Sequence, residues 1–140
     1  MSIFDQFGTD HTKEEEGVWI DFGPNSDGTN PSFKIARMSS SNKKFALAVE
    51  KATKPFTFAN GKLKTIPKDK SDELFLNVFC EVVLLDWKHV QTKHGEEIPY
   101  TKENAKDLMK KLPELYSTLQ NHSGEMSLYL EEEKDENSKN

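Results

Sequence analysis

The chain has 140 residues, of which 34% are hydrophobic and 31% charged, and its formal net charge is −5. A chain of this size suits one domain with a single modest core, and its apolar stretches are too short and too charged to span a bilayer. Residues 1–30 and 71–140 are acidic, whereas residues 32–70 are basic. This distribution favours self-association or a charged protein partner as readily as nucleic acid.

Residues 1–16 begin the chain as a short apolar turn followed by acids. Ile3, Phe4 and Phe7 fit one helical turn, and we expect the run Glu14–Glu16 to be exposed. Two interpretations remain open for this flexible N-terminal arm, a frayed end or a partner-binding segment. The arm lacks the basic start and apolar stretch of a signal peptide, so we expect a cytoplasmic protein.

Two alternating segments follow, Gly17–Phe22 and Ser32–Met38, separated by the turn-forming loop Gly23–Pro31. Alternation of apolar and polar side chains predicts strands, and the loop between them predicts an antiparallel β-hairpin. Two strands alone are marginally stable in water, so the hairpin must pack on helices or pair with another chain. Its open edges make it a candidate oligomerisation surface.

A helix is predicted from Asn42 to about Thr53, with an N-cap hydroxyl from Ser39–Ser41 and a stop at Pro55. Its apolar residues recur on one face and would form a buried stripe. They are Phe45, Ala48, Val49 and Ala52. The segment Phe56–Ile66 is ambiguous between a short hairpin around its Asn-Gly pair and an exposed loop.

Asp72–Lys88 is the longest apolar segment, and we predict a single central helix over its whole length. Its apolar residues recur at three- and four-residue steps and cover most of the circumference, which is typical of a helix wrapped by other elements. Ser71 is placed to cap this helix. Cys80 is the single cysteine of the chain, which rules out an internal disulfide, and its place in the run predicts a buried thiol.

Two more helices complete the predicted fold. The first begins after Thr101, the second runs from Pro113 to about Leu130, and the acidic segment 131–140 is expected to be a disordered tail. The prediction is an α+β, mainly α-helical domain over residues 17–130. In this domain the N-terminal antiparallel β-hairpin packs on a bundle of about four helices.

The sequence shows no catalytic, cofactor-binding or metal-binding constellation. His89, His94, Glu96 and Glu97 share a polar loop, where a zinc ion or a general base would be sought. Their spacing matches no recognised motif, and exposed loop histidines beside surface acids describe them better. We therefore expect a protein that is not an enzyme and carries no cofactor or metal.

A basic block brackets the corner between the hairpin and the helix after it. Its residues are Lys34, Arg37, Lys43 and Lys44, with Phe33 and Phe45 nearby. Basic residues with aromatics are typical of single-strand binders, but both phenylalanines lie on faces assigned to the core, and an acidic chain repels phosphate. Nucleic acid is therefore disfavoured relative to a solvated face, or one that meets the acidic half of a neighbouring subunit.

Several stretches together resemble one family. They are Glu14–Gly23, Phe33–Arg37, Ser41–Phe45, Thr53–Pro55, Trp87, Ile98–Ala105 and Leu112–Leu115. In their order and spacing, over most of the chain, they are similar to the tail assembly chaperones of long-tailed bacteriophages and prophages.

The resemblance implies a non-enzymatic assembly factor that works in the host cell cytoplasm and is absent from the mature virion. Its partners would be the tape measure protein, which it binds and keeps soluble, and the tail tube protein, which it helps to recruit. It would act as a homo-oligomer, without membrane or nucleic acid. The alternatives are a structural tail or neck subunit retained in the virion and a small nucleic-acid-binding module.

Such a chaperone needs an apolar groove with a charged rim, presented in many copies. We expect the groove between Asp72–Lys88 and the final helix, with the hairpin edge joining copies. The candidate partner-binding residues are Trp19, Arg37, Lys43, Lys44, Trp87 and Tyr100. Aromatic side chains dominate interface energies, so Trp19 and Tyr100 are candidate anchors, with ordinary packing as the alternative for both.

Overall fold

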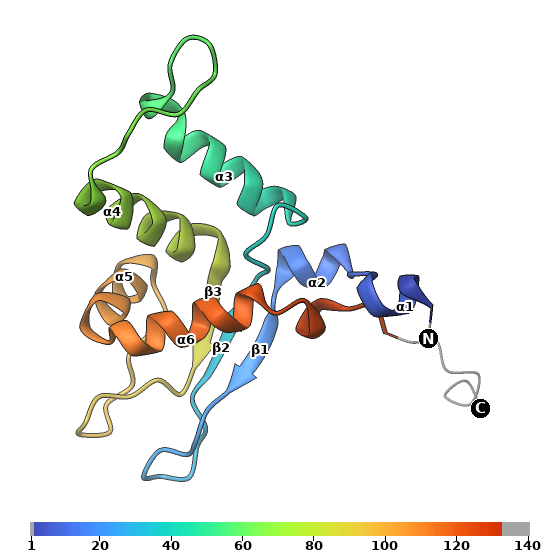
Figure 1. Ribbon diagram of the computed structural model, residues 1–140. Coiled ribbons are helices and arrows are strands. Elements are labelled where there is room, and N and C mark those ends of the chain that lie inside the picture. The colour runs from blue at the N-terminus through green and yellow to red at the C-terminus, as the bar shows by residue number, and fades with distance from the viewer. Residues whose placement is uncertain (1, 133–140) are drawn as a thin grey trace.

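The computed structural model describes residues 2–132, and it is an α+β fold in which helices surround a small antiparallel sheet (Figure 1). The elements are α1 (Ile3–Phe7), α2 (His11–Glu16), β1 (Val18–Asp21), β2 (Ser32–Ile35), α3 (Lys43–Thr53), η1 (Lys54–Phe56), α4 (Lys68–Val78), η2 (Phe79–Val83), β3 (Leu84–Lys88), α5 (Lys102–Lys111), α6 (Pro113–Gly124) and η3 (Met126–Tyr129). The mainly helical α+β class and the N-terminal hairpin are confirmed. The predicted tail lies, from residue 133 onward, outside the described residues.

The sheet has the order β1-β2-β3, with both pairs antiparallel. β2 is the central strand, and its Phe33 stands opposite Ile20 of β1 and Trp87 of β3. The rings of Phe33 and Trp87 meet edge to face with centroids 5.9 Å apart. Because β2 is paired on both sides, the hairpin gains the third strand that two strands need for stability in water.

The prediction of a single helix over Asp72–Lys88 is wrong. The helix α4 begins earlier, at Lys68, passes into five π-helical residues (η2), and the chain then continues directly as the strand β3. Ser71 makes no cap, since α4 starts after Pro67 without a side-chain cap. A fully apolar run is compatible with a helix or a buried strand, and pairing with β2 selects the strand for its last residues.

Two other boundaries differ from the prediction. Asn42, rather than the serines before it, caps α3, because its side-chain oxygen accepts from the backbone N–H of Lys44 at 3.1 Å. The final helix ends at Gly124, and the 3-10 helix η3 follows after an extended Glu125. The ambiguous segment after α3 contains a short turn, in which the backbone N–H of Phe58 donates to the carbonyl of Lys62 at 2.8 Å.

The core lies between the sheet and the helices α4, α5 and α6. Its fully buried side chains include Ile35, Val83 and Leu84 of the strand region, and Ala105 and Leu119 of the last two helices. Cys80 is also fully buried, as predicted, and burial raises the pKa of its thiol to about 11. Neither α1 nor α3 contributes a fully buried residue, and α3 meets the core only through partly buried side chains such as Phe45.

Candidate functional site

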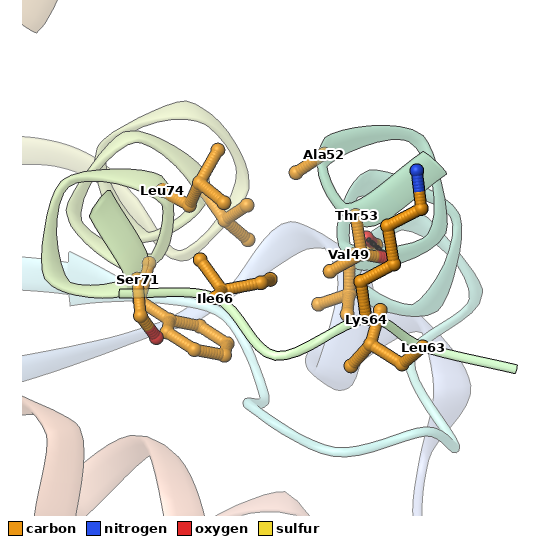
Figure 2. A pocket seen from close by; sticks show the side chains of 10 residues that line it. Val49, Ala52, Thr53, Leu63, Lys64, Ile66, Ser71 and Leu74 are labelled. Carbon is orange, nitrogen blue, oxygen red and sulfur yellow. Dashed lines mark hydrogen bonds between the residues drawn. The ribbon is translucent and has the colours of Figure 1, made fainter. Parts of the chain in front are cut away.

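An apolar groove lies between α3 and α4, and the segment leading into α4 forms its third side (Figure 2). Figure 2 shows Val49 and Ala52 of α3 facing Leu74 of α4, with Ile66 between them. The groove has a volume of about 230 Å³. Its lining residues are Val49, Ala52, Thr53, Leu63, Lys64, Ile66, Ser71, Leu74, Phe75 and Val78.

The sequence of α3 explains why the groove stays open. The predicted stripe is apolar as expected, but the expectation that it is buried is wrong, because all four of its residues are only half-buried. Ala52 leaves space where a larger side chain would reach α4. A helix whose apolar face is only partly covered by the rest of its own fold is a candidate surface for a partner.

Large apolar side chains are exposed around the groove. Leu63 and Phe75, which line it, are 59% and 49% exposed, and Phe58 in the adjoining turn is 53% exposed. Single exposed hydrophobic residues are ordinary on protein surfaces, whereas several gathered beside an apolar groove mark an interaction site. The residues of this groove and of its turn therefore form the strongest candidate site in the described part of the chain.

The groove has a basic rim. Six exposed lysines belong to the end of α3, the turn and the start of α4, against three acids in the same stretch. The lysines are Lys51, Lys54, Lys62, Lys64, Lys68 and Lys70, and the acids are Glu50, Asp69 and Asp72. The Lys68 ammonium lies 3.2 Å from Asp72, and the Lys64 ammonium lies 5.3 Å from the centroid of the Phe58 ring. The site thus combines an apolar floor with a cationic edge.

The groove expected between the central segment and the final helix is a different and more polar hollow. It lies between α4 and the helices α5 and α6, and Asp69, Asp72 and Glu73 edge it. Glu73 lies 3.6 Å from Lys110 of α5, so an ion pair spans the hollow. The more apolar groove therefore lies between α4 and α3, the helix before it.

The three aromatic residues singled out from the sequence lie in different surroundings. Trp19 projects from the edge strand β1, is 37% exposed, and has the Lys88 ammonium 4.1 Å from its ring centroid. Trp87 belongs to the core, and its indole N–H donates to the carbonyl of Ile98 at 2.7 Å. Trp87 is therefore not available as a surface contact.

Tyr100 packs against Trp87, with ring centroids 5.3 Å apart. Its hydroxyl donates to the carbonyl of Leu84 at 2.7 Å, and burial raises its pKa to about 12. These contacts are those of a side chain packed within its own fold, which was the alternative to an interface anchor for Tyr100. Of the two predicted aromatic anchors, Trp19 alone is exposed, and the Lys88 ammonium covers part of its ring.

The predicted basic block is divided in the structure. The Arg37 side chain turns inward, whereas Lys43 and Lys44 are exposed at the start of α3. Lys34 and Lys44 do line one shallow hollow, but Glu15, Glu16 and Glu81 line it as well, so acids of the same chain lie beside them. The four basic residues do not form one patch on the surface.

The inward turn of Arg37 leads to a residue that the sequence did not reveal as important, Glu14. Its side chain is fully buried, which overturns the expected exposure at this position. It accepts hydrogen bonds from Ser41 at 2.6 Å and from Thr9 at 3.2 Å. His11 Nδ1 lies 3.1 Å from the same carboxylate, and the Arg37 guanidinium lies beside it with Nε at 3.7 Å. Glutamate is almost never buried unpaired, so a run of three glutamates carries no signal that its first member is internal.

In the described part of the chain, the side chains that could bind a metal ion are not clustered. Within residues 2–132, no three His, Cys, Asp or Glu side chains are placed to hold an ion. His89 lies 3.8 Å from Glu97 in an exposed loop. Over the same residues, no helix has both the length and the apolar content of a membrane span.

Comparison with known proteins adds one finding. The family described as YdaY prophage protein matches residues 40–140, a stretch that holds α3, α4 and the whole groove and leaves β1 and β2 outside. No curated protein and no solved structure matches the chain. Since the family match covers well over half of the residues, the chain belongs to the YdaY prophage protein family.

Proposed function

We propose that this prophage protein is a tail assembly chaperone, and that its α3–α4 groove binds apolar helical stretches of the tape measure protein. The observation that supports the proposal most is the apolar groove bordered by exposed Leu63, Phe75 and Phe58. An amphipathic helix laid in such a groove buries its apolar face and leaves its polar face in water. The lysine rim suits a client with acidic residues beside its apolar stripe.

The proposed role requires no chemistry of the chaperone itself. Masking apolar surface until the client is taken into a growing tube requires a reversible contact, repeated along a long chain by many copies. The protein would act in the host cell cytoplasm, help to recruit the tail tube protein, and leave before the virion is complete. It would thus work as a binding protein rather than as an enzyme.

The experiment is co-expression of this protein with the tape measure protein of the same prophage. Wild-type protein should keep the client soluble and co-purify with it. Ala52→Glu, which puts a carboxylate into the groove, should leave the client insoluble, because burying an unpaired charge against apolar surface is costly. The yield of soluble client, measured against total client, gives the readout.

Leu47→Glu is the matched control. Leu47 is 64% exposed and does not line the groove, and helical spacing places it on the face of α3 opposite Val49. The Leu47→Glu variant carries the same added charge in the same helix but outside the groove, so it should keep the client soluble as wild type does. Equal loss with both variants, or an insoluble client with wild-type protein, would contradict the proposal. Detection of the protein in purified virions would instead favour the structural subunit.

A further inference from the structure

The helix α1 presents an apolar face that nothing in the described chain covers. Ile3, Phe4 and Phe7 are 65%, 87% and 58% exposed, and no residue of α1 is buried. The N-terminus of this helix is nevertheless stabilised, because Ser2 and Asp5 form a reciprocal capping box. A formed helix that holds three large apolar side chains in water presents a ready ligand for an apolar groove.

The chain directly after α1 is fastened at the end of the molecule away from the groove. The backbone N–H of Asp10 donates to the carbonyl of Tyr129 at 2.7 Å, and that of Glu131 donates to the carbonyl of Gly8 at 3.0 Å. Gly8 follows α1 immediately and is itself part of this anchor, and Figure 1 shows α1 at the opposite end from the turn that follows α3. The helix α1 therefore cannot reach the groove of its own chain.

The two surfaces have complementary charge. Among the described residues, Asp5, Asp10, Glu131 and Glu132 lie around α1, with Lys13 as the one lysine or arginine beside them. The groove carries the rim of six lysines and three acids described above. Docking would therefore set a net negative surface against a net positive one, which favours encounter and orientation.

The two surfaces also agree in size and shape. Ile3 and Phe7 are four residues apart and so share one side of α1, with Phe4 beside them. The groove volume of about 230 Å³ exceeds the roughly 150 Å³ that accommodates a benzene ring in a protein cavity. One phenyl ring can therefore enter the groove while the other side chains cover its edge.

We propose that α1 of one copy docks in the α3–α4 groove of the next copy. The two contacting surfaces are different, so the interface is heterologous and head to tail, and repetition gives a ring or a helical row. The inference deepens the proposed function, because α1 and the tape measure protein would then compete for one groove. Docking of α1 requires the groove but does not require the tape measure protein.

The test uses analytical ultracentrifugation of three forms of the full chain: wild type, Phe4→Ser and Ala52→Glu. Wild-type protein should assemble as concentration rises, and each variant should associate about tenfold to a hundredfold more weakly, as expected for losing one buried phenylalanine. The decisive step is the mixture. Phe4→Ser keeps an intact groove and Ala52→Glu keeps an intact α1, so equal amounts of the two should form a dimer and stop there.

Leu47→Glu should assemble as wild type does, and circular dichroism should show that every variant stays folded, since Phe4 and Ala52 are not in the core. The proposal is overturned if wild-type protein is monomeric at every accessible concentration, if both variants assemble as wild type does, or if their mixture stays monomeric. If wild-type protein assembles as predicted but the tape measure protein stays insoluble in its presence, the proposed function is wrong and the docking of α1 stands. If wild-type protein is monomeric but keeps the tape measure protein soluble, the docking of α1 is wrong and the proposed function stands.

Discussion

Glu14 shows at the scale of one residue how the N-terminal segment is joined to the rest of the molecule. Its carboxylate accepts a hydrogen bond from the hydroxyl of Ser41, which precedes α3. The same carboxylate lies beside the guanidinium of Arg37, which follows β2. Its backbone carbonyl accepts from the backbone N–H of Arg37 at 2.8 Å and from the side-chain amide of Asn42 at 3.0 Å. One residue of α2 thereby holds the corner between the sheet and α3.

We expect Glu14→Ala to lower the free energy of unfolding by about 3 kcal/mol, since removing one partner of a buried ion pair leaves the other charge unpaired. Glu16→Ala is the control, because Glu16 is exposed in the same helix, and it should change stability by less than about 0.5 kcal/mol. Urea unfolding followed by tryptophan fluorescence measures both. Similar small effects for the two variants would show that the buried contacts of Glu14 contribute little.

Among the elements, the passage from α4 through η2 into β3 sets the limit of prediction from sequence. The run 72–88 is apolar almost throughout, and such a run fits a buried helix and a buried strand equally well. What decides is a non-local fact: β2 has a free edge that β3 fills. The hairpin, α3 and the last helices could be predicted because their turn formers, caps and prolines are local signals.

The same reasoning explains which parts of the site were predictable. The apolar stripe of α3 could be read from helical spacing, whereas the expectation of a groove came from the resemblance to tail assembly chaperones. The position of the groove could not be read, because the sequence does not say which side of α4 the helices α5 and α6 cover. Trp87 and Tyr100 likewise differ from Trp19 only through the tertiary contacts that bury them.

Gly17 joins α2 to β1 in a backbone conformation with φ of +90°, and a Cβ there would lie 3.1 Å from the backbone of Ile35. We expect Gly17→Ala to destabilise the protein by about 2 kcal/mol, through backbone strain together with that close contact. Gly28→Ala tests the strain alone, because φ is +89° and nothing lies within 4 Å of the added atom. Its cost should be about 1 kcal/mol, measured by thermal unfolding. An equal loss at both sites would show that the contact with Ile35 is relieved at no cost.

At the scale of the whole molecule, the sheet and the last three long helices form the stable part, and α3 with the following turn is attached to its edge. The helix α3 has no buried residue, whereas β2 is almost wholly buried between two partner strands. Segments with few buried apolar contacts open locally at low free-energy cost. The groove is therefore built on the part of the fold that adapts most readily to an occupant.

We expect the backbone amides of α3 to exchange with deuterium at least about tenfold faster than those of β2, because α3 has no buried residue and meets the core only through partly buried side chains such as Phe45. Hydrogen exchange read by mass spectrometry measures this, with the Phe4→Ser variant used so that docking between copies does not protect the groove. Equal exchange in the two segments would show that α3 opens only when the whole molecule unfolds.

The pairing of residues near the two ends of the chain has a practical consequence. Thr9 and Leu130 form an isolated antiparallel bridge, so sequence positions that are far apart emerge together at the corner that carries α1. An affinity tag fused ahead of α1 would therefore be attached next to the proposed docking helix and remote from the groove of its own chain (Figure 1). Such a tag is suited to reporting on docking of α1, whereas a probe in the turn between η1 and α4 would respond to any occupant of the groove.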